Sequence, residues 1–594
     1  MNCQTSRASL LRGGGRVSSA IISSSQSLRL PSSGARFIST RELDASKGDR
    51  ERVLILGSGW SGFTLSRQLD PAKYQTVVIS PRSYFVFTPL LASTAVGTLE
   101  FRSALESVRG RGRWRGWGLV GGGWGGWGAR GNGVEFWQGW ADDVDFDGKT
   151  IRVEENAVER AKNASGGVVE KRGKGRVFEV GYDKLVVGVG CYSQTFGIEG
   201  VRENALFLKD VGDARKIRKR ILECELGLFF FMLWIFLELG SDGLSLLNLE
   251  RTPIKSLPRW FKWSVTQFIG WDGIGMWRDE EMKSMHSLIP TIGFEVAALP
   301  TSSDALKKQL LNFAIVGGGP TGVEFAAELF DLCHEDLSTL YPSLTPHVNI
   351  TIYDVAPKIL PMFDKNLANY ALEHFKRDGI HIKTEHHILG LRPGLPLSGA
   401  AGEDGGGSER GFTLRLKEEG EVGVGMCVWS TGLMMNPFIE KALSSVHTYP
   451  TRSATATAAA SSDGGVDKLV EKKWELKRSP KTGGLMVDEH FRVKLATRPP
   501  SGEAGASEHT PYEATMNDVF ALGDVAVLGN TALPATAQVA NQEAKWLGKR
   551  LNGLGKGEKI GEGKGFTFRN MGIMTYVGGM KAIMQTDGKG EIKG

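Results

Sequence analysis

Two glycine-rich turns with the same spacing are the stretches of this chain best suited to hold a phosphate. Residues 57–62 read Gly-Ser-Gly-Trp-Ser-Gly and residues 317–322 read Gly-Gly-Gly-Pro-Thr-Gly. Each follows an apolar run of strand length and precedes a helix-forming run. One glycine makes the tight turn, the next lets the backbone approach a pyrophosphate, and the third lets helix and strand pack closely. One such turn alone could be a loop without a ligand, but two of them predict two nucleotide-binding domains.

Side chains at the ends of later predicted strands suggest which nucleotides these are. Asp354 ends the strand 348–353, where a carboxylate accepts hydrogen bonds from an adenosine ribose and repels a 2′-phosphate, so NADH should be preferred over NADPH. The strand that follows the first turn ends instead at Ser80, and the group that holds the ribose there is left open. Asp524 follows Gly523 directly after a predicted strand, at a place that suits a carboxylate accepting from a hydroxyl group of a bound cofactor. A simple turn aspartate is the alternative for both acids.

The elements that must position these residues alternate between strands and helices. We expect strands at 52–56, 76–79, 184–189, 348–353, 422–430 and 517–522, and helices at 63–69, from the second turn to about 332, and at 535–551. Gly-, Ala- and Ser-rich stretches at 393–411, 452–466 and 497–514 are typical of surface loops. With 594 residues, the chain has room for two or more domains with their own cores.

The positive charge of the chain is confined to its N-terminus. The net charge is +6, and residues 1–41 contain six arginines, eleven serines, no lysine and no acid, so the remainder is formally neutral. This argues against a nucleic-acid partner. An Arg- and Ser-rich, acid-poor N-terminus predicts a mitochondrial transit peptide over residues 1–45, with a disordered basic tail as the alternative.

The five cysteines are widely spaced and form no CxxC or CxxxxC pair. We therefore expect neither a disulfide framework nor a cysteine metal site, and no metal is predicted.

Two blocks interrupt the regular pattern. Residues 109–133 contain twelve glycines and four tryptophans, and residues 225–293 contain five tryptophans. The first block could be an Arg-Gly RNA-binding segment but is better explained as an inserted loop. The second has an apolar run, 226–237, that is too short to span a bilayer. We interpret 225–293 as a non-native insertion, translated from a retained intron.

Several longer motifs carry a resemblance to a known family. They are Ser80-Pro81-Arg82-Ser83-Tyr84-Phe85-Val86-Phe87-Thr88-Pro89-Leu90-Leu91, residues 93–102, Phe207-Leu208-Lys209-Asp210-Val211, residues 317–329, Ala521-Leu522-Gly523-Asp524 and Ala535-Thr536-Ala537-Gln538-Val539-Ala540. With these, the chain resembles the fungal mitochondrial alternative (type II, rotenone-insensitive) NADH:ubiquinone oxidoreductases, of the internal, matrix-facing type. In that family Cys224 would adjoin Phe294, which agrees with an insertion at 225–293.

The resemblance implies an α/β fold with two Rossmann-like dinucleotide-binding domains, one for FAD and one for NADH. The FAD-binding domain is expected in two segments, 46–210 and 431–565, with the NADH-binding domain at 294–430 between them. Residues 566–594 would be the start of a C-terminal membrane-association region that is cut short. The implied non-covalent FAD site is Gly57, Gly59, Trp60, Ser61, Gly62, Ser80, Arg82, Gly188, Gly190, Gly523, Asp524 and Ala537. The implied NADH site is Gly317, Gly319, Pro320, Thr321, Gly322, Glu324, Asp354, Thr431 and Gly432.

The resemblance also implies where the reaction occurs. NADH would lie against the flavin with Glu324 near its carboxamide, and ubiquinone would enter near Gln538 and Asn541, with Thr88 and Pro89 bordering the ring. Some relatives have a histidine where this chain has Asn541, so no proton donor is assigned. Peripheral association with the inner membrane, on the matrix side and without proton pumping, is expected, and a homodimer is left open.

Two alternatives stand beside this interpretation. One is another two-nucleotide flavoprotein, such as a sulfide:quinone reductase, whose chemistry needs a cysteine pair that this chain lacks. The other is a catalytically silent NADH-responsive protein similar to apoptosis-inducing factor, or a disrupted gene product that does not fold.

Overall fold

The computed structural model describes most of the chain outside the irregular blocks. The described residues are 39–109, 134–162, 168–173, 175–221, 294–300, 302–396, 411–443, 454–456, 473–497, 512–529, 533–555, 558–586 and 589–593. The expected insertion 225–293, nearly all of 109–133 and most of the expected transit peptide lie outside them. The chain divides into two units, 1–48 and 49–594. In the first, helix α1 (Thr40–Ala45) begins with a capping box, in which Ser39 Oγ accepts from the Glu42 amide.

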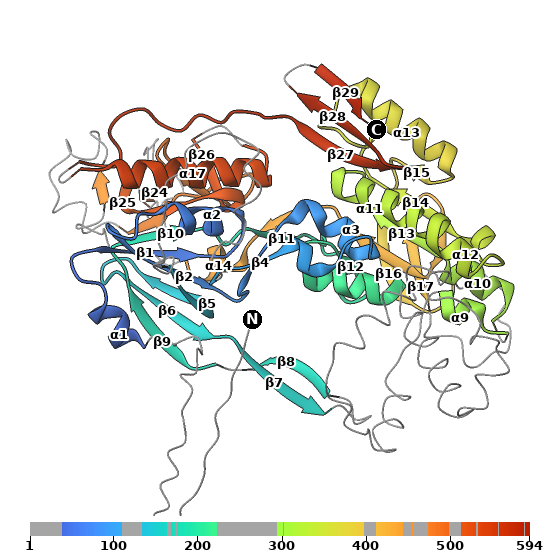
Figure 1. Ribbon diagram of the computed structural model, residues 1–594, viewed down its shortest axis with the longest axis horizontal. Coiled ribbons are helices and arrows are strands. Elements are labelled where there is room, and N and C mark those ends of the chain that lie inside the picture. The colour runs from blue at the N-terminus through green and yellow to red at the C-terminus, as the bar shows by residue number, and fades with distance from the viewer. Residues whose placement is uncertain are drawn as a thin grey trace, which may run out of the picture. The chain divides into compact units, whose positions relative to one another are not determined.

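The first glycine turn belongs to a large mixed sheet with a parallel centre. Strands β25 (Glu513–Ala521), β10 (Lys184–Val187), β1 (Glu51–Leu56), β2 (Tyr74–Ser80) and β5 (Val134–Asp145) lie side by side in that order and run parallel. Every residue of β2 is buried, as expected for a parallel strand covered on both faces. Helices α2 (Trp60–Gln68) and α17 (Ala537–Gly553) pack against each other over these strands (Figure 1).

Antiparallel strands extend this sheet at both sides. They are β6 (Thr150–Glu155), β9 (Val177–Gly181), β21 (Ala454–Ala456), β22 (Trp474–Leu476), β23 (Leu485–Val487), β24 (Arg492–Thr497) and β26 (Ala526–Leu528), the last of which runs parallel to β23. Smaller elements are β3 (Tyr84–Val86), η1 (Thr88–Leu90), α3 (Leu91–Val96), η2 (Phe101–Ala104), β4 (Leu105–Ser107), β7 (Ala157–Lys162), β8 (Val168–Gly173) and η7 (Gly523–Val525). Of these, α3 packs against helix α11 (Pro320–Asp331) of the other half.

The second glycine turn belongs to a five-stranded parallel sheet. Its order is β12 (Leu206–Phe207), β19 (Met426–Trp429), β13 (Asn312–Val316), β14 (Asn349–Tyr353) and β15 (His381–Lys383). Helix α11 (Pro320–Asp331) follows the turn, and α13 (Lys365–Asp378) precedes β15. Strand β12 lies in this sheet although the sequence motifs place the end of the first FAD-binding segment at residue 210.

The other elements around this sheet are mostly short. They are α4 (Val201–Asn204), α9 (Phe294–Ala298), α10 (Asp304–Leu310), the π-helical η5 (Leu332–Leu337), α12 (Ser338–Leu340), η6 (Thr345–His347) and the antiparallel sheet of β16 (Ile388–Pro393), β17 (Phe412–Leu416) and β18 (Gly420–Val424). Helix α14 (Pro437–Lys441) contacts β5 of the large sheet instead. The chain passes between the halves at β11 (Cys191–Ser193) and β20 (Leu433–Met435), which pair antiparallel.

The C-terminal strands β27 (Ile573–Gly578), β28 (Lys581–Thr586) and β29 (Lys589–Lys593) form an antiparallel sheet, drawn in red beside α13 in Figure 1. Helix α11 holds this sheet through two side chains. Thr575 Oγ1 donates to Glu324 Oε1 at 3.0 Å, and the Tyr576 hydroxyl donates to Asp331 Oδ2 at 2.5 Å. None of the helices within the described ranges is long and apolar enough to cross a membrane.

Two expectations about local structure are wrong. The apolar run 422–430 is not one strand, because Gly425 ends the hairpin strand β18 before β19 enters the parallel sheet. A Cβ on Gly425 would lie 1.9 Å from the Leu310 carbonyl oxygen, so this close crossing requires glycine. The stretch 452–466 is not wholly loop either, since β21 pairs with β25.

Candidate functional site

The first turn is built so tightly that two backbones touch. Gly57 has φ +105°, and a Cβ there would lie 2.3 Å from the carbonyl oxygen of Gly188, at the end of the neighbouring strand β10. One turn of chain later, a Cβ on Gly62 would lie 2.0 Å from the Gly57 carbonyl oxygen. Gly59 caps α2 without a side chain, which leaves the helix N-terminus open to an anion.

The end of β2 is occupied by hydroxyl groups. Ser58 Oγ lies 2.9 Å from Ser80 Oγ, and both serines are buried. Ser58 Oγ also bonds the carbonyl oxygens of Arg82 and Tyr84, at 2.9 and 3.1 Å. The Arg82 guanidinium turns to Asp210, 2.9 Å away. Ser80 is therefore committed to the turn itself.

The Gly523–Asp524 turn closes the same site from β25. Asp524 Oδ2 accepts from Cys191 Sγ at 2.8 Å, and Lys209 Nζ lies 3.3 Å from that sulfur and 4.0 Å from the same oxygen. Burial, followed by the nearby Asp524 charge, raises the pKa of Cys191 to about 11, so the thiol keeps the proton that it donates. The Gly523 amide donates to Glu543 Oε2 on α17 at 2.6 Å.

The second turn repeats this arrangement against Ser430 and Thr431, at the end of the neighbouring strand β19. Gly317 has φ +117°, and a Cβ there would lie 2.9 Å from Ser430 Oγ and from Thr431 Cβ. Ser430 Oγ donates to the Val316 carbonyl oxygen at 3.0 Å. The ends of β13 and β19 therefore meet at the turn, which places Thr431 and Gly432 beside it. Pro320 and the exposed Thr321 open α11.

Asp354 ties the end of β14 to this second turn. Its Oδ2 accepts from the Gly318 amide at 2.5 Å and its Oδ1 accepts from the Ala356 amide at 2.7 Å. A carboxylate has about four lone-pair positions, so it retains acceptor capacity for a ribose hydroxyl. The position suits the predicted role.

Glu324 lies one turn into α11 and faces the C-terminal sheet. Besides Thr575 Oγ1, it bonds the backbone of Tyr576. Burial raises the pKa of Glu324 to about 7, with the Glu328 charge adding to the rise and the two hydrogen bonds opposing it. A fraction of the Glu324 population is therefore protonated at neutral pH.

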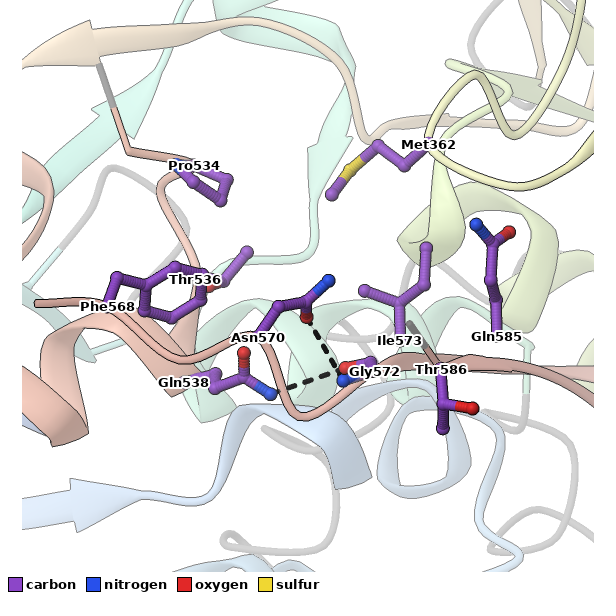
Figure 2. A pocket seen from close by; sticks show the side chains of 10 residues that line it. All are labelled: Met362, Pro534, Thr536, Gln538, Phe568, Asn570, Gly572, Ile573, Gln585 and Thr586. Carbon is purple, nitrogen blue, oxygen red and sulfur yellow. Dashed lines mark hydrogen bonds between the residues drawn. The ribbon is translucent and has the colours of Figure 1, made fainter. Parts of the chain in front are cut away.

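A cavity of about 300 Å³ lies where α17 begins, between the linker before β27 and the C-terminal sheet. Figure 2 shows its lining, which is Met362, Pro534, Thr536, Gln538, Phe568, Asn570, Gly572, Ile573, Gln585 and Thr586. Gln538 fixes the linker at its rim by donating to the Gly572 carbonyl oxygen and accepting from the Met571 amide, both at 3.3 Å. The volume is at the lower end of the range for small-molecule sites.

The other residues expected near a quinone lie elsewhere. Asn541 donates to Thr64 Oγ1 at 2.9 Å, which joins α17 to α2 and turns the amide away from the cavity. Thr88 Oγ1 accepts from Trp60 Nε1 at 3.0 Å. Thr88 and Pro89 are exposed.

The two glycine turns, the Gly523–Asp524 turn and Asp354 each sit at the carboxyl ends of parallel strands, as expected. Residues that sequence reasoning missed are Cys191, Lys209 and Glu543 at the Gly523–Asp524 turn, and all of the cavity lining except Gln538. Glu543 carried a signal, because it is an acid on the buried face of a helix with apolar neighbours. Nothing local in the sequence brings Met362 to Phe568.

The residues of the first half fit a dinucleotide. A phosphate group can approach the α2 N-terminus because nothing lies within 4 Å of a Cβ placed on Gly59. A Cβ placed on Gly57 or Gly62 would instead collide with backbone atoms of the turn and of Gly188. The Asp524 carboxylate follows β25, which is separated from β1 by β10 alone, and it supplies an acceptor for a polyol hydroxyl. No cluster of three or more metal-ligating side chains occurs in the portion that the structure describes.

Comparison with known proteins agrees with this geometry. The family described as "Pyridine nucleotide-disulphide oxidoreductase" matches residues 51–226 and 288–448. A probable NADH dehydrogenase of Dictyostelium discoideum is 29% identical over 91% of this chain and 81% of its own length. An external alternative NADH-ubiquinone oxidoreductase, mitochondrial, of Yarrowia lipolytica is 26% identical over 86% of this chain and 61% of its own length.

Among solved structures, NDH2 of Plasmodium falciparum in complex with NADH has a TM-score of 0.57 at 20% identity, with 92% of both chains covered. The match shows that the two chains share a fold. The expected fold, with two Rossmann-like domains, is confirmed, and so is the resemblance to alternative NADH-ubiquinone oxidoreductases.

Proposed function

The chain belongs to the pyridine nucleotide-disulphide oxidoreductase family, and from that premise we propose that it oxidises NADH and reduces ubiquinone by two electrons, with FAD bound non-covalently at the first turn. One observation carries the proposal: two complete dinucleotide turns stand on two parallel sheets, while the chain contains no CxxC or CxxxxC pair. A sulfide substrate would need paired cysteines beside the flavin. Of the described cysteines, Cys191 lies at the Gly523–Asp524 turn, whereas Cys333 and Cys427 are buried in the cores of the other half. The names of both relatives support NADH as the donor, and the second supports ubiquinone as the acceptor.

On the donor side, the chain's own residues would bind and orient NADH. The α11 N-terminus faces the pyrophosphate, Asp354 accepts from the adenosine ribose, and Thr431 and Gly432 border the nicotinamide end. Glu324 would lie near the carboxamide and, in its protonated form, could donate to the carboxamide oxygen. Bound FAD would supply the hydride and electron-transfer chemistry, and the protein would contribute positioning and electrostatics.

On the acceptor side, the cavity of Figure 2 offers a place for a quinone head group. It has apolar walls, among them Phe568 and Ile573, and polar atoms at Gln538, Asn570 and Thr586, which matches the needs of a ring with two carbonyl oxygens. Gln538 is the predicted quinone residue that lines it, whereas Asn541 keeps the role of fastening α17 to α2.

The place of the reaction is proposed as well. The names of several relatives include the word mitochondrial, and the Arg- and Ser-rich N-terminus supports the same compartment. The proposal includes association of the C-terminal region with the matrix face of the inner membrane, as in the internal type of these enzymes. It also includes electron transfer without proton pumping.

The proposed domain order keeps 225–293 as an insertion between the FAD-binding and NADH-binding segments. The family match stops at residue 226 and resumes at residue 288, which supports this interpretation. Peptide mapping of the native protein tests it: we expect no peptides from 226–292, and their recovery would refute the insertion.

The activity is tested by the colour of the purified protein. We expect a yellow protein that NADH bleaches and a short-chain quinone reoxidises. A colourless protein that binds NADH without turnover would favour a silent NADH-responsive protein and would overturn the proposal.

The quinone cavity is tested by two glutamines one turn apart on α17. Gln538 bonds Gly572 and Met571, and Gln542 makes the equivalent pair of bonds to Arg569, at 2.8 and 3.1 Å. Gln542 does not line the cavity. We expect Gln538→Ala to raise the KM for quinone roughly 10-fold without changing the KM for NADH, and Gln542→Ala to change neither. Equal effects of both variants would assign the result to loosening of the linker and not to quinone contact.

A further inference from the structure

The Gly523–Asp524 turn is held from beneath by a carboxyl group that is nearly inaccessible to water. Glu543 is 3% exposed, and its Oε2 accepts the Gly523 amide proton at 2.6 Å. Gly523 has φ +70°, and a Cβ there would be in ordinary van der Waals contact, at 3.4 Å, with both Ala540 Cβ and Ser61 Oγ. The first turn of α2, the body of α17 and the end of β25 therefore meet at Gly523.

The other side of the turn is held by Cys191. Its thiol donates to Asp524 Oδ2 at 2.8 Å, and Lys209 Nζ lies within 4.0 Å of the same oxygen. A carboxylate has about four lone-pair positions, so Asp524 can still accept a polyol hydroxyl. The backbone of the turn and its carboxylate are thus fixed by different side chains, neither of which belongs to the Gly-Asp pair itself.

The charged groups around Glu543 favour a neutral acid. Asp524 stands at the turn and raises the pKa of Glu543, while desolvation is the larger cause and the Gly523 amide opposes both, giving a pKa of about 8. On α2, the helix packed along α17, the charged side chain is Arg67, which bonds the carbonyl oxygens of Ser107 and Val108 and pairs with Glu106 at 3.9 Å. Lys209 is directed to Asp524 and Cys191.

We propose that Glu543, with Cys191, is a positioning residue for the flavin: as a neutral acid it accepts the Gly523 amide proton and holds Asp524 where it can accept a ribityl hydroxyl. The Asp524 charge disfavours a second negative charge on the buried Glu543, so Glu543 keeps its proton. When Glu543 ionises, a second negative charge appears near Asp524 and repels it. The affinity of the turn for FAD should then fall. The inference rests on the proposed function, because it assumes FAD at the first turn.

The test measures FAD dissociation from the full-length protein by flavin fluorescence, after removal and readdition of FAD. Glu543→Gln keeps an acceptor and the volume of a neutral acid, and Glu543→Met keeps the volume alone. At pH 7 we expect Glu543→Gln to bind FAD within about twofold of wild type, and Glu543→Met to bind roughly 10-fold more weakly, because a buried N–H loses its acceptor.

The pH profile separates positioning from packing. The wild-type dissociation constant for FAD should rise between pH 7 and pH 9, by roughly fivefold, while that of Glu543→Gln stays flat. For the second holding group, Cys191→Ser should retain FAD affinity and Cys191→Ala should weaken it, since only serine keeps a donor. Lys545→Gln, an exposed neighbour on α17, is the control for the helix.

Failure of this inference can be told from failure of the proposed function. A wild-type protein that binds no flavin would overturn the proposed function. A wild type that binds FAD with the same affinity and the same pH profile as Glu543→Met would overturn the positioning role. If Glu543→Met folds poorly, the comparison of wild type with Glu543→Gln across pH still decides, because an identical profile in both contradicts the neutral acid.

Discussion

The two glycine turns share one spacing but are completed by different partners. At the first, the position after the leading glycine is Ser58, which bonds the Ser80 hydroxyl at the end of β2. At the second, the same position is Gly318, whose amide donates to the carboxylate of Asp354 at the end of β14. The first turn closes with buried hydroxyl groups, and the second closes with a half-buried carboxyl group that has acceptor capacity left. We therefore expect the spacing to provide a place for a pyrophosphate and the end of the neighbouring strand to determine which nucleotide binds.

The walls of the turns differ in the same way. Gly57 abuts a backbone carbonyl, that of Gly188, whereas Gly317 abuts the side chains of Ser430 and Thr431. A Cβ on Gly57 would lie 2.3 Å from a backbone oxygen, whereas the nearest atoms at Gly317 are 2.9 Å away, and one of them, Ser430 Oγ, can change rotamer. The FAD turn should therefore tolerate less change than the NADH turn.

The largest expected effect comes from replacing the leading glycines. Gly57→Ala should lower the free energy of unfolding by roughly 3 kcal/mol or more, because the new Cβ meets backbone at a positive φ, and flavin should be lost. Gly317→Ala should cost less, about 1–2 kcal/mol, with a raised KM for NADH and flavin retained. Urea unfolding measures the loss of stability in each variant, and the flavin content of the purified protein measures the retention of FAD. Equal costs would show that the two walls are equally rigid and would break the comparison.

The next effect concerns the choice of nucleotide. Asp354→Ser gives the second turn the residue type of the first, but Gly318 brings no hydroxyl to pair with it. We expect the KM for NADH to rise roughly 10-fold or more and the preference for NADH over NADPH to fall by a similar factor, because the ribose acceptor and its charge are both lost. Asp364→Ser, at the cap of α13, is the control and should leave the ratio of the two KM values unchanged. An unchanged ratio in Asp354→Ser would refute its role in specificity.

A third prediction compares the buried acids on the two helices. Glu324 and Glu543 have pKa values raised to about 7 and about 8 from an ordinary value near 4.5. The folded state then binds more protons than the unfolded state, so stability should be full below about pH 4.5 and fall as pH rises, for Glu324 up to about pH 7 and for Glu543 up to about pH 8. The measurement is the thermal unfolding temperature between pH 5 and pH 9. This temperature should fall less with rising pH in Glu324→Gln and Glu543→Gln than in the wild type. Variant curves parallel to that of the wild type would contradict the raised values.

The smallest effect is expected at Ser80. Because the Ser80 hydroxyl is hydrogen-bonded to Ser58, Ser80→Ala should lower the free energy of unfolding by about 1 kcal/mol and change the FAD dissociation constant less than about twofold. Ser58→Ala removes three contacts of the same hydroxyl and should cost more. A large loss of FAD affinity in Ser80→Ala would mean that Ser80 contacts the adenosine ribose, and the contrast with Asp354 would weaken.

Several features follow from the sequence alone. Glycines at fixed offsets after an apolar run have few other uses, so both turns and the strands β1, β13 and β14 were predictable from local sequence. The expected strand 422–430 failed because apolar content continues through Gly425, and the sequence does not show that the Leu310 carbonyl oxygen passes there. The position of Asp354 and Asp524 at the ends of strands was predictable because a polar residue directly after a buried strand is a local signal, and their roles in binding stay predictions.

Other features were decided by the tertiary structure, because they join segments that are far apart in the chain. The Glu543 bond to Gly523, the Cys191 bond to Asp524 and the cavity shared by Met362, Gln538 and Phe568 depend on how α17, β11 and the linker before β27 come together. Sequence spacing determines what a turn can bind, since the turn is made by consecutive residues. Packing between distant segments holds the Gly523–Asp524 turn in place and buries the Glu543 carboxyl group beside it. Cys191 and Asp524, for example, are more than 300 residues apart in the chain.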